Sequence, residues 1–159
     1  MLARTKKPQL EEGASLIELA LLLGILGPVL LLGTAEVSAF VFASMELSDA
    51  THAAASYSAQ YYMSQSTPAL PTQAEVTAAA TNDAPELVKM LSSGTSLSVS
   101  MATGCGTGSA TAGNTIPSCS SGTLPYVQIT ATATVTPIVK FLNFTSFPMT
   151  SQATVNLVN

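Results

Sequence analysis

The chain has 159 residues, and only 9% of them are charged, against roughly a quarter in ordinary soluble domains. Its formal net charge is −4, and its one basic cluster lies within the first seven residues. This composition argues against nucleic-acid binding through phosphate contacts, and it indicates a chain that is embedded in a membrane or packed into a larger assembly.

The first predicted element is a membrane-spanning helix over about residues 19–44. No residue from 19 to 35 is charged, and Glu18 and Glu36 are the only charged residues between Ala14 and Met45. As a helix, residues 19–35 measure about 25 Å, and the continuation past Glu36 covers the roughly 30 Å hydrocarbon core of a bilayer. The sequence holds no second segment of this kind, so we expect a single span.

The orientation of this span follows from the distribution of basic residues. Arg4, Lys6 and Lys7 precede it, and no Lys or Arg follows it before Lys89. The positive-inside rule therefore predicts a cytoplasmic N-terminus and an extracytoplasmic C-terminal region.

Glu18 stands out because an ionisable residue in a membrane helix is costly and indicates a function. It follows Gly13 by five residues in the segment GASLIELALLL (residues 13–23), and charged residues precede the glycine. This arrangement resembles a class III prepilin signal. The segment from residue 17 to 23 is similar to the start of the TadE-like family, whose members resemble type IV pilins and belong to tight-adherence (Flp-type) pilus and secretion systems. The residue after the glutamate, Leu19, departs from the family, which often has an aromatic residue there.

The resemblance implies that residues 1–13 are a class III prepilin leader and that a prepilin peptidase cuts between Gly13 and Ala14. The cut creates an α-ammonium group on Ala14 at the membrane interface. The Glu18 carboxylate, on the same or a neighbouring subunit, is then expected to neutralise this charge and to select an axial register between helices. Ser15 and Glu18 also fit a capping box at the start of a helix, which leaves the pilin role open.

Gly27 and Pro28 lie inside the predicted span. Pro28 lacks an N–H group, so this pair is expected to kink the helix or to let another helix approach closely. Membrane helices also tolerate Gly and Pro without any special role, and the sequence does not decide between these readings.

The helix is expected to continue to about Ser64, within a helical region of residues 14–66 that includes the span. Beyond the span, apolar residues recur at spacings of three and four and predict a stripe that packs on the protein's own domain. The stripe consists of Leu47, Ala50, Ala54, Tyr57 and Tyr61.

Two short helices and three strands are predicted after a linker marked by Pro68 and Pro71. Thr72 and Glu75 form a capping box for a helix to about Thr81, and Asp83 and Glu86 repeat this signal for a helix that ends near Gly94. Alternating apolar residues predict strands over residues 97–101, 126–136 and 149–158, with a loop over residues 103–123.

Residues 67–159 are thus expected to form a small extracytoplasmic domain with a three-stranded antiparallel sheet against the long helix. The fold class is α+β and resembles the general pilin plan.

Cys105 and Cys119 lie in a Gly/Ser/Thr-rich stretch with no nearby histidine, which favours a structural disulfide over a metal or redox site. Closing this loop would stabilise the fold by roughly 3 kcal/mol in the chain-entropy model. A disulfide also indicates an oxidising, extracytoplasmic compartment.

The predicted function is that of a minor pilin or pseudopilin in the bacterial inner membrane or an extracellular pilus. Its expected partners are the membrane, prepilin peptidase and other pilin subunits, which it meets through the N-terminal helix. The chain has a single histidine, no acid cluster and no phosphate-binding loop, so we expect no enzyme activity, metal or cofactor. Two alternatives stay open: an uncleaved single-span anchor that displays a small binding domain, and a domain secreted after conventional cleavage that follows Ala39.

Overall fold

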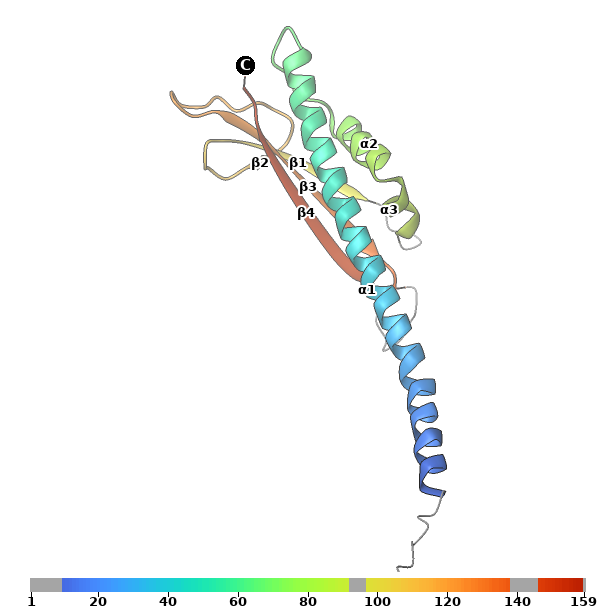
Figure 1. Cartoon of the computed structure of the whole chain (residues 1–159). Helices are drawn as coiled ribbons and strands as arrows, with labels where there is room; N and C mark the ends of the chain where they lie inside the picture. The colour runs from blue at the N-terminus through green and yellow to red at the C-terminus, as the bar shows by residue number, and fades with distance from the viewer. Residues whose placement is uncertain (1–9, 92–96, 138–145, 159) are drawn as a thin grey trace, which may run out of the picture. The chain divides into compact units, whose positions relative to one another are not determined.

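The structure is a computed structural model of the whole chain, and it describes residues 10–91, 97–137 and 146–158 (Figure 1). The chain divides into two compact units, Met1–Ser38 and Ala39–Asn159. Helix α1 spans Leu10–Ser64, and its side chains are described from Ser15 onward. The second half of α1 belongs to the C-terminal unit because it packs into the core of that unit.

The second half of α1 buries one face that is built mainly from small residues. Two polar residues are also fully buried there, Thr51 and Ser58. Their hydroxyls donate to the carbonyl oxygens one turn earlier, at 2.6 Å to Leu47 and 2.8 Å to Ala54. Because these bonds satisfy the hydroxyls within the helix, their burial leaves no orphan donor in the core. The apolar residues of this face are Ala43, Leu47, Ala50, Ala54, Ala55 and Tyr62.

The predicted stripe is correct as far as Ala54 and wrong at its two tyrosines. Tyr57 and Tyr61 are only half-buried, and their ring centroids lie 6.1 Å apart. Ser58 and Tyr62 take the buried positions instead. The large tyrosine rings therefore lie at the margin of the packed face.

Helix α2, Gln73–Asp83, begins at the predicted capping box. The hydroxyl of Thr72 accepts from the Glu75 N–H group, and the Glu75 carboxylate accepts from the Thr72 N–H group at 2.8 Å. The second predicted capping box is wrong, since Asp83 is the last residue of α2. Helix α3, Pro85–Met90, starts instead from Ala84, whose methyl side chain cannot accept a hydrogen bond. Proline at the first helical position provides the start signal. The predicted end near Gly94 is also wrong, because α3 ends at Met90, and Leu91 is already extended and pairs with Val135.

The described strands form one antiparallel sheet in the order β2-β1-β3-β4. The predicted three-stranded sheet is therefore wrong by one strand. The extra strand, β2, pairs with Ala102 and Thr103 of β1 and lies inside the segment that was expected to be a loop. Its sequence has no apolar alternation, so only the neighbouring strand reveals it. The strands are β1 (Ser98–Cys105), β2 (Thr111–Ala112), β3 (Pro125–Val135) and β4 (Phe147–Asn156).

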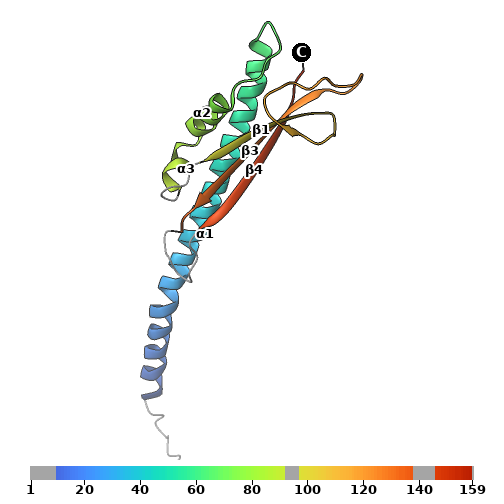
Figure 2. The same ribbon diagram turned by 180° about the vertical axis from the view of Figure 1, so that it is seen from behind.

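The C-terminal unit has two layers, with α2, α3 and the second half of α1 on one face of the sheet (Figures 1 and 2). Val127, Ile129 and Ala131 of β3 are fully buried, whereas Thr132 is exposed on the other face. The core joins these β3 residues to Leu47 of α1. The start of β4 also meets α1, because the rings of Phe40 and Phe147 pack edge to face with centroids 6.0 Å apart.

Candidate functional site

The N-terminal unit presents an exposed apolar helical surface. The large apolar side chains from Leu16 to Leu32 are each between 46% and 73% exposed. The apolar window that includes them has a mean hydropathy of 2.4. A helix that packs on a domain would instead show one apolar stripe and one polar face.

Apolar residues around the whole circumference of a helix need a non-aqueous environment or a shell of other helices. Within the described residues, α1 is the one helix long and apolar enough to cross a membrane. At about 1.5 Å per residue, its first half alone exceeds the thickness of the hydrocarbon core.

Glu18 is exposed on this surface and lines a shallow groove with four apolar side chains. The other members are Leu21, Leu22, Ile25 and Leu26. Their spacing of three, four, seven and eight residues from Glu18 places them on one helical face. These four neighbours of Glu18 were not predicted as site residues from the sequence, although their spacing from Glu18 along a helix could have identified them.

The expected cleavage point lies in the first turns of α1. Gly13 and Ala14 are helical in the backbone, and the side chain of Ala14 lies outside the described residues. Ala14 and Glu18 are four residues apart in a continuous helix, so they are neighbours on one face. Because the uncut helix begins at Leu10, Ser15 is an interior residue, and the expected Ser15–Glu18 capping box is wrong for this chain.

The glycines of the N-terminal unit leave room beside the helix. A Cβ atom at Gly24, Gly27 or Gly33 would meet nothing within 4 Å among the described residues, apart from the helix's own local backbone. The helix continues on both sides of Pro28, and the expected kink at this residue stays a prediction. Gly27 follows Glu18 by nine residues, about two and a half turns, which places it on the opposite face.

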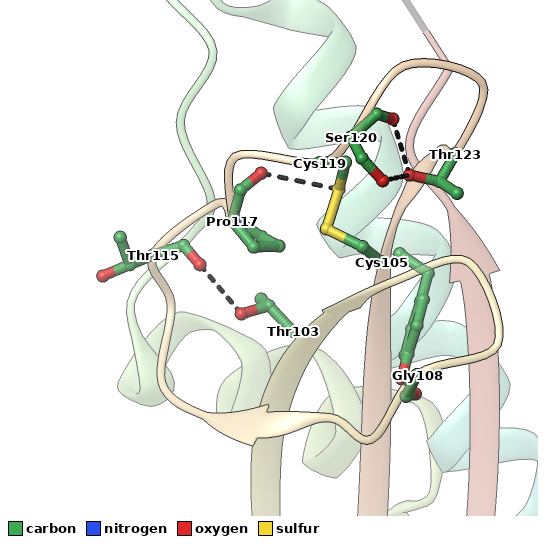
Figure 3. The surroundings of a disulfide bond; sticks show 9 residues. Thr103, Cys105, Gly108, Thr115, Pro117, Cys119, Ser120 and Thr123 are labelled. Atoms are coloured by element: carbon green, nitrogen blue, oxygen red, sulfur yellow. Dashed lines mark hydrogen bonds between the residues drawn. A yellow bond between two sulfur atoms is a disulfide. The ribbon is translucent and has the colours of Figure 1, made fainter.

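The disulfide between Cys105 and Cys119 is confirmed, with the two Cα atoms 5.5 Å apart. It ties the end of β1 to the loop that precedes β3 (Figure 3). Within the same loop the buried hydroxyl of Thr103 donates to the Thr115 carbonyl oxygen at 2.8 Å. On the other side, Thr123 donates to the Ser120 carbonyl oxygen at 2.8 Å. The disulfide thus lies in a loop that hydrogen bonds hold on both sides.

Among the described residues, no group of three or more His, Cys, Asp or Glu side chains comes together in a way that could hold a metal ion. No protein-family model, curated protein or solved structure matches this chain. The candidate site is therefore the exposed apolar part of α1 with Glu18 in it.

Proposed function

We propose that this chain is a TadE-like minor pilin or pseudopilin. It enters the bacterial inner membrane through α1, loses residues 1–13 to prepilin peptidase and joins a tight-adherence (type IV-like) pilus or secretion filament by helix-to-helix packing. The N-terminus is cytoplasmic, and the domain that follows the membrane span lies outside the membrane.

The observation that carries this proposal is the position of Glu18. It is the single charged residue among residues 15–35, and it is exposed in a helical segment whose apolar side chains are also exposed. A simple membrane anchor has no reason to place a carboxylate at the edge of its span, because a charge that enters the hydrocarbon region costs about 3 kcal/mol or more. A partner charge that is created at the same depth provides the reason.

That partner is the new N-terminus of Ala14. Its α-ammonium group is positively charged at neutral pH, since its ordinary pKa lies just below 8. The attraction between this group and a carboxylate grows as the effective dielectric constant falls, whereas either charge alone is costly to bury. A pair formed between neighbouring subunits favours one axial register, because a shift along the helix separates the two charges.

Two faces of α1 are suited to neighbouring helices. The face of Glu18 offers a groove lined by Leu21 and Ile25. The opposite face carries Gly27, where a Cβ atom would meet no described neighbour, and small residues let helices approach closely in lipid. A subunit inside a filament needs at least two such faces, one for each neighbour.

The disulfide and the basic leader agree on the orientation. Cys105–Cys119 fits an oxidising compartment for the C-terminal unit. Arg4, Lys6 and Lys7 fit a cytoplasmic N-terminus. The disulfide and the basic residues lie in different parts of the chain, so their agreement supports the proposed topology.

The test is the N-terminus of the full chain after extraction from membranes, measured by intact mass and terminal peptide sequencing. A chain that begins at Ala14 supports the proposal. An intact Met1 would identify an uncleaved anchor, and a chain that begins near Phe40 would identify a secreted domain. Either of these two results overturns it.

A variant at the cleavage point sharpens the test. Gly13→Leu is expected to block processing and leave the chain at full mass, because the resemblance to a class III prepilin signal implies that the cut follows a glycine. Gly24→Leu is the matched control, since it places the same side chain into open space on the same helix. Normal processing of Gly13→Leu would contradict the assigned cleavage point.

A further inference from the structure

The pattern of hydrogen bonds between the strands shows which backbone groups point away from the sheet at each of its two outer edges. The Leu157 N–H group donates to the Pro125 carbonyl oxygen at 2.8 Å, one pair beyond Tyr126 and Asn156 in the β3–β4 register. Bonded and non-bonded pairs alternate in an antiparallel ladder. The odd-numbered residues of β4 therefore bond to β3, and the backbone groups of its even-numbered residues point outward.

The edge formed by β1 is closed. Its outward backbone groups belong to odd-numbered residues by the same alternation. The Val99 carbonyl oxygen accepts from the side-chain amide of Gln73, at the start of α2. The Met101 carbonyl oxygen accepts from the Gly113 N–H group at 3.0 Å, and Thr103 pairs with β2. This edge has little left to offer another strand.

The edge formed by β4 is open. The outward backbone groups belong to Pro148, which has no N–H group, and to Thr150, Gln152, Thr154 and Asn156. Among the described residues, nothing bonds to the backbone of these last four, and all four are exposed. No residue of β4 is charged. A long, uncharged edge strand is a template for pairing with another chain.

We propose that β4 pairs antiparallel with β4 of a second copy of this chain, so that two sheets join into one. In the register that leaves out Pro148, Thr150 pairs with Asn156 of the second copy, and Gln152 pairs with Thr154 of the second copy. Each outward N–H and C=O group of these four residues then has a partner. This inference concerns the C-terminal unit and is independent of the proposed pilin function.

A second copy is the occupant because β4 is complementary to itself. A two-fold interface brings the same patch together from both chains, and here it opposes hydroxyl and amide side chains without any like charges. The two-fold axis passes between Ala153 and its copy, in a non-bonded pair where Cα atoms approach to about 4.5 Å. The methyl side chain of alanine suits this close approach. The lack of charge on β4 offers nothing by which a charged partner peptide would be selected.

The test uses the full chain and pairs of single-cysteine variants. Two copies with different epitope tags are produced together, one with Gln152→Cys and one with Thr154→Cys. Cα atoms of a bonded pair are about 5.5 Å apart, within the range of a disulfide. Both natural cysteines are bonded to each other, so they add no free thiol. The control pair combines Gln152→Cys with Ser100→Cys, which is exposed on the same sheet face but lies in β1.

We expect a cross-linked dimer of the two tagged chains at a yield well above that of the control pair, with mass spectrometry locating the bond between positions 152 and 154. Equal yields in both pairs would overturn the proposal. A product that joins Gln152→Cys to a different protein, with no dimer of this chain, would also overturn it.

A charge variant provides a second, independent readout. The pair Thr150→Cys and Asn156→Cys reports the same interface, while Gln152→Lys with Thr154→Lys in both copies places like charges opposite each other. We expect the yield to fall on the order of fivefold. Ser100→Lys should leave it unchanged. Yields are compared at equal amounts of chain with the Cys105–Cys119 disulfide formed, so that misfolding is not counted. An unchanged yield in the double lysine variant would mean that β4 is not the interface.

Discussion

Tyr126 lies directly over Gly104 in the neighbouring strand. The two residues are opposite each other in the β1–β3 ladder, and a Cβ atom at position 104 would stand 2.5 Å from Cζ of the tyrosine. Tyr126 is buried, and its hydroxyl donates to the Gly108 carbonyl oxygen in the loop that follows β1. The absence of a side chain at Gly104 therefore allows an aromatic ring to anchor the loop that the disulfide closes.

Gly104→Ala is expected to destabilise the C-terminal unit by about 1–3 kcal/mol, because a methyl group would overlap a buried ring and displace it. Thermal unfolding of the detergent-solubilised full chain measures this change. Thr132→Ala, on the exposed face of β3, is the control and should change the stability by less than about 0.5 kcal/mol. Equal unfolding midpoints for Gly104→Ala and the natural chain would show that the ring does not need this space.

Removing the disulfide should lower the free energy of unfolding by roughly 3 kcal/mol in the chain-entropy model. The double variant Cys105→Ser, Cys119→Ser tests this by denaturant unfolding without leaving a lone thiol. The natural chain under a reducing agent should approach the same value. If the double variant matched the oxidised natural chain, the loop would be held by its hydrogen bonds alone, such as the one from Thr103 to Thr115.

The capping box of α2 predicts a pH dependence. Hydrogen bonds from the backbone N–H and then the hydroxyl of Thr72 lower the pKa of Glu75 below its ordinary value of 4.5, and desolvation opposes them. A carboxylate whose pKa is lower in the folded state than in the unfolded chain stabilises the fold, and this stabilisation is complete when the pH is above the ordinary pKa. This contribution to stability is lost as the pH falls through the pKa of the carboxyl group in the folded state.

Glu75→Gln should therefore make the stability of the fold fall less steeply as the pH is lowered into the acid range. The unfolding midpoint is followed from neutral pH down through 4.5, where the natural chain should lose more stability than the variant. Glu86→Gln is the control. Glu86 is also exposed, in the first turn of α3, where it pairs with Lys89 at 2.6 Å. Parallel curves for Glu75→Gln and the natural chain would contradict the predicted role of the capping box.

Under the proposed function, Glu18→Ala should leave membrane insertion and leader removal intact but abolish incorporation into filaments. The loss follows because the α-ammonium group of Ala14 would then have no carboxylate at its depth. Fractionation of membranes and sheared filaments, followed by quantitative immunoblotting, separates these steps. Leu21→Ala removes an apolar side chain from the same groove without changing its charge. This variant should reduce incorporation into filaments far less than Glu18→Ala does. Normal incorporation of Glu18→Ala would refute the charge-pair mechanism.

Several elements could be predicted from the sequence because their signals are local. The end of α1 at Ser64 and the start of α2 after Thr72 follow from helical periodicity and a capping box. Strand β3 follows from strict alternation of apolar residues and threonine. Side chains within one turn or one strand determine these features, so no knowledge of distant neighbours is needed.

The charged residue of the candidate site and the disulfide could be predicted from the sequence, whereas the packed face of α1 could be predicted only in part. The exposed apolar segment and Glu18 follow from hydropathy and charge, and the pairing of Cys105 with Cys119 follows from cysteine count. The choice of Ser58 and Tyr62 as buried residues did not follow, since Tyr57 and Tyr61 fit the helical period as well. Packing against the sheet decides which of two adjacent stripes faces the core.

By itself the sequence determined one long apolar helix with a single carboxylate near its start and a C-terminal α+β unit, because hydropathy, periodicity and charge act along the chain. Only the tertiary structure decided that β2 exists, that Tyr126 covers Gly104, and that β4 is the open edge of the sheet. These features depend on which strands become neighbours and in which register. Strand order is set by the free energy of packing the whole core, to which residues far apart in the sequence contribute together.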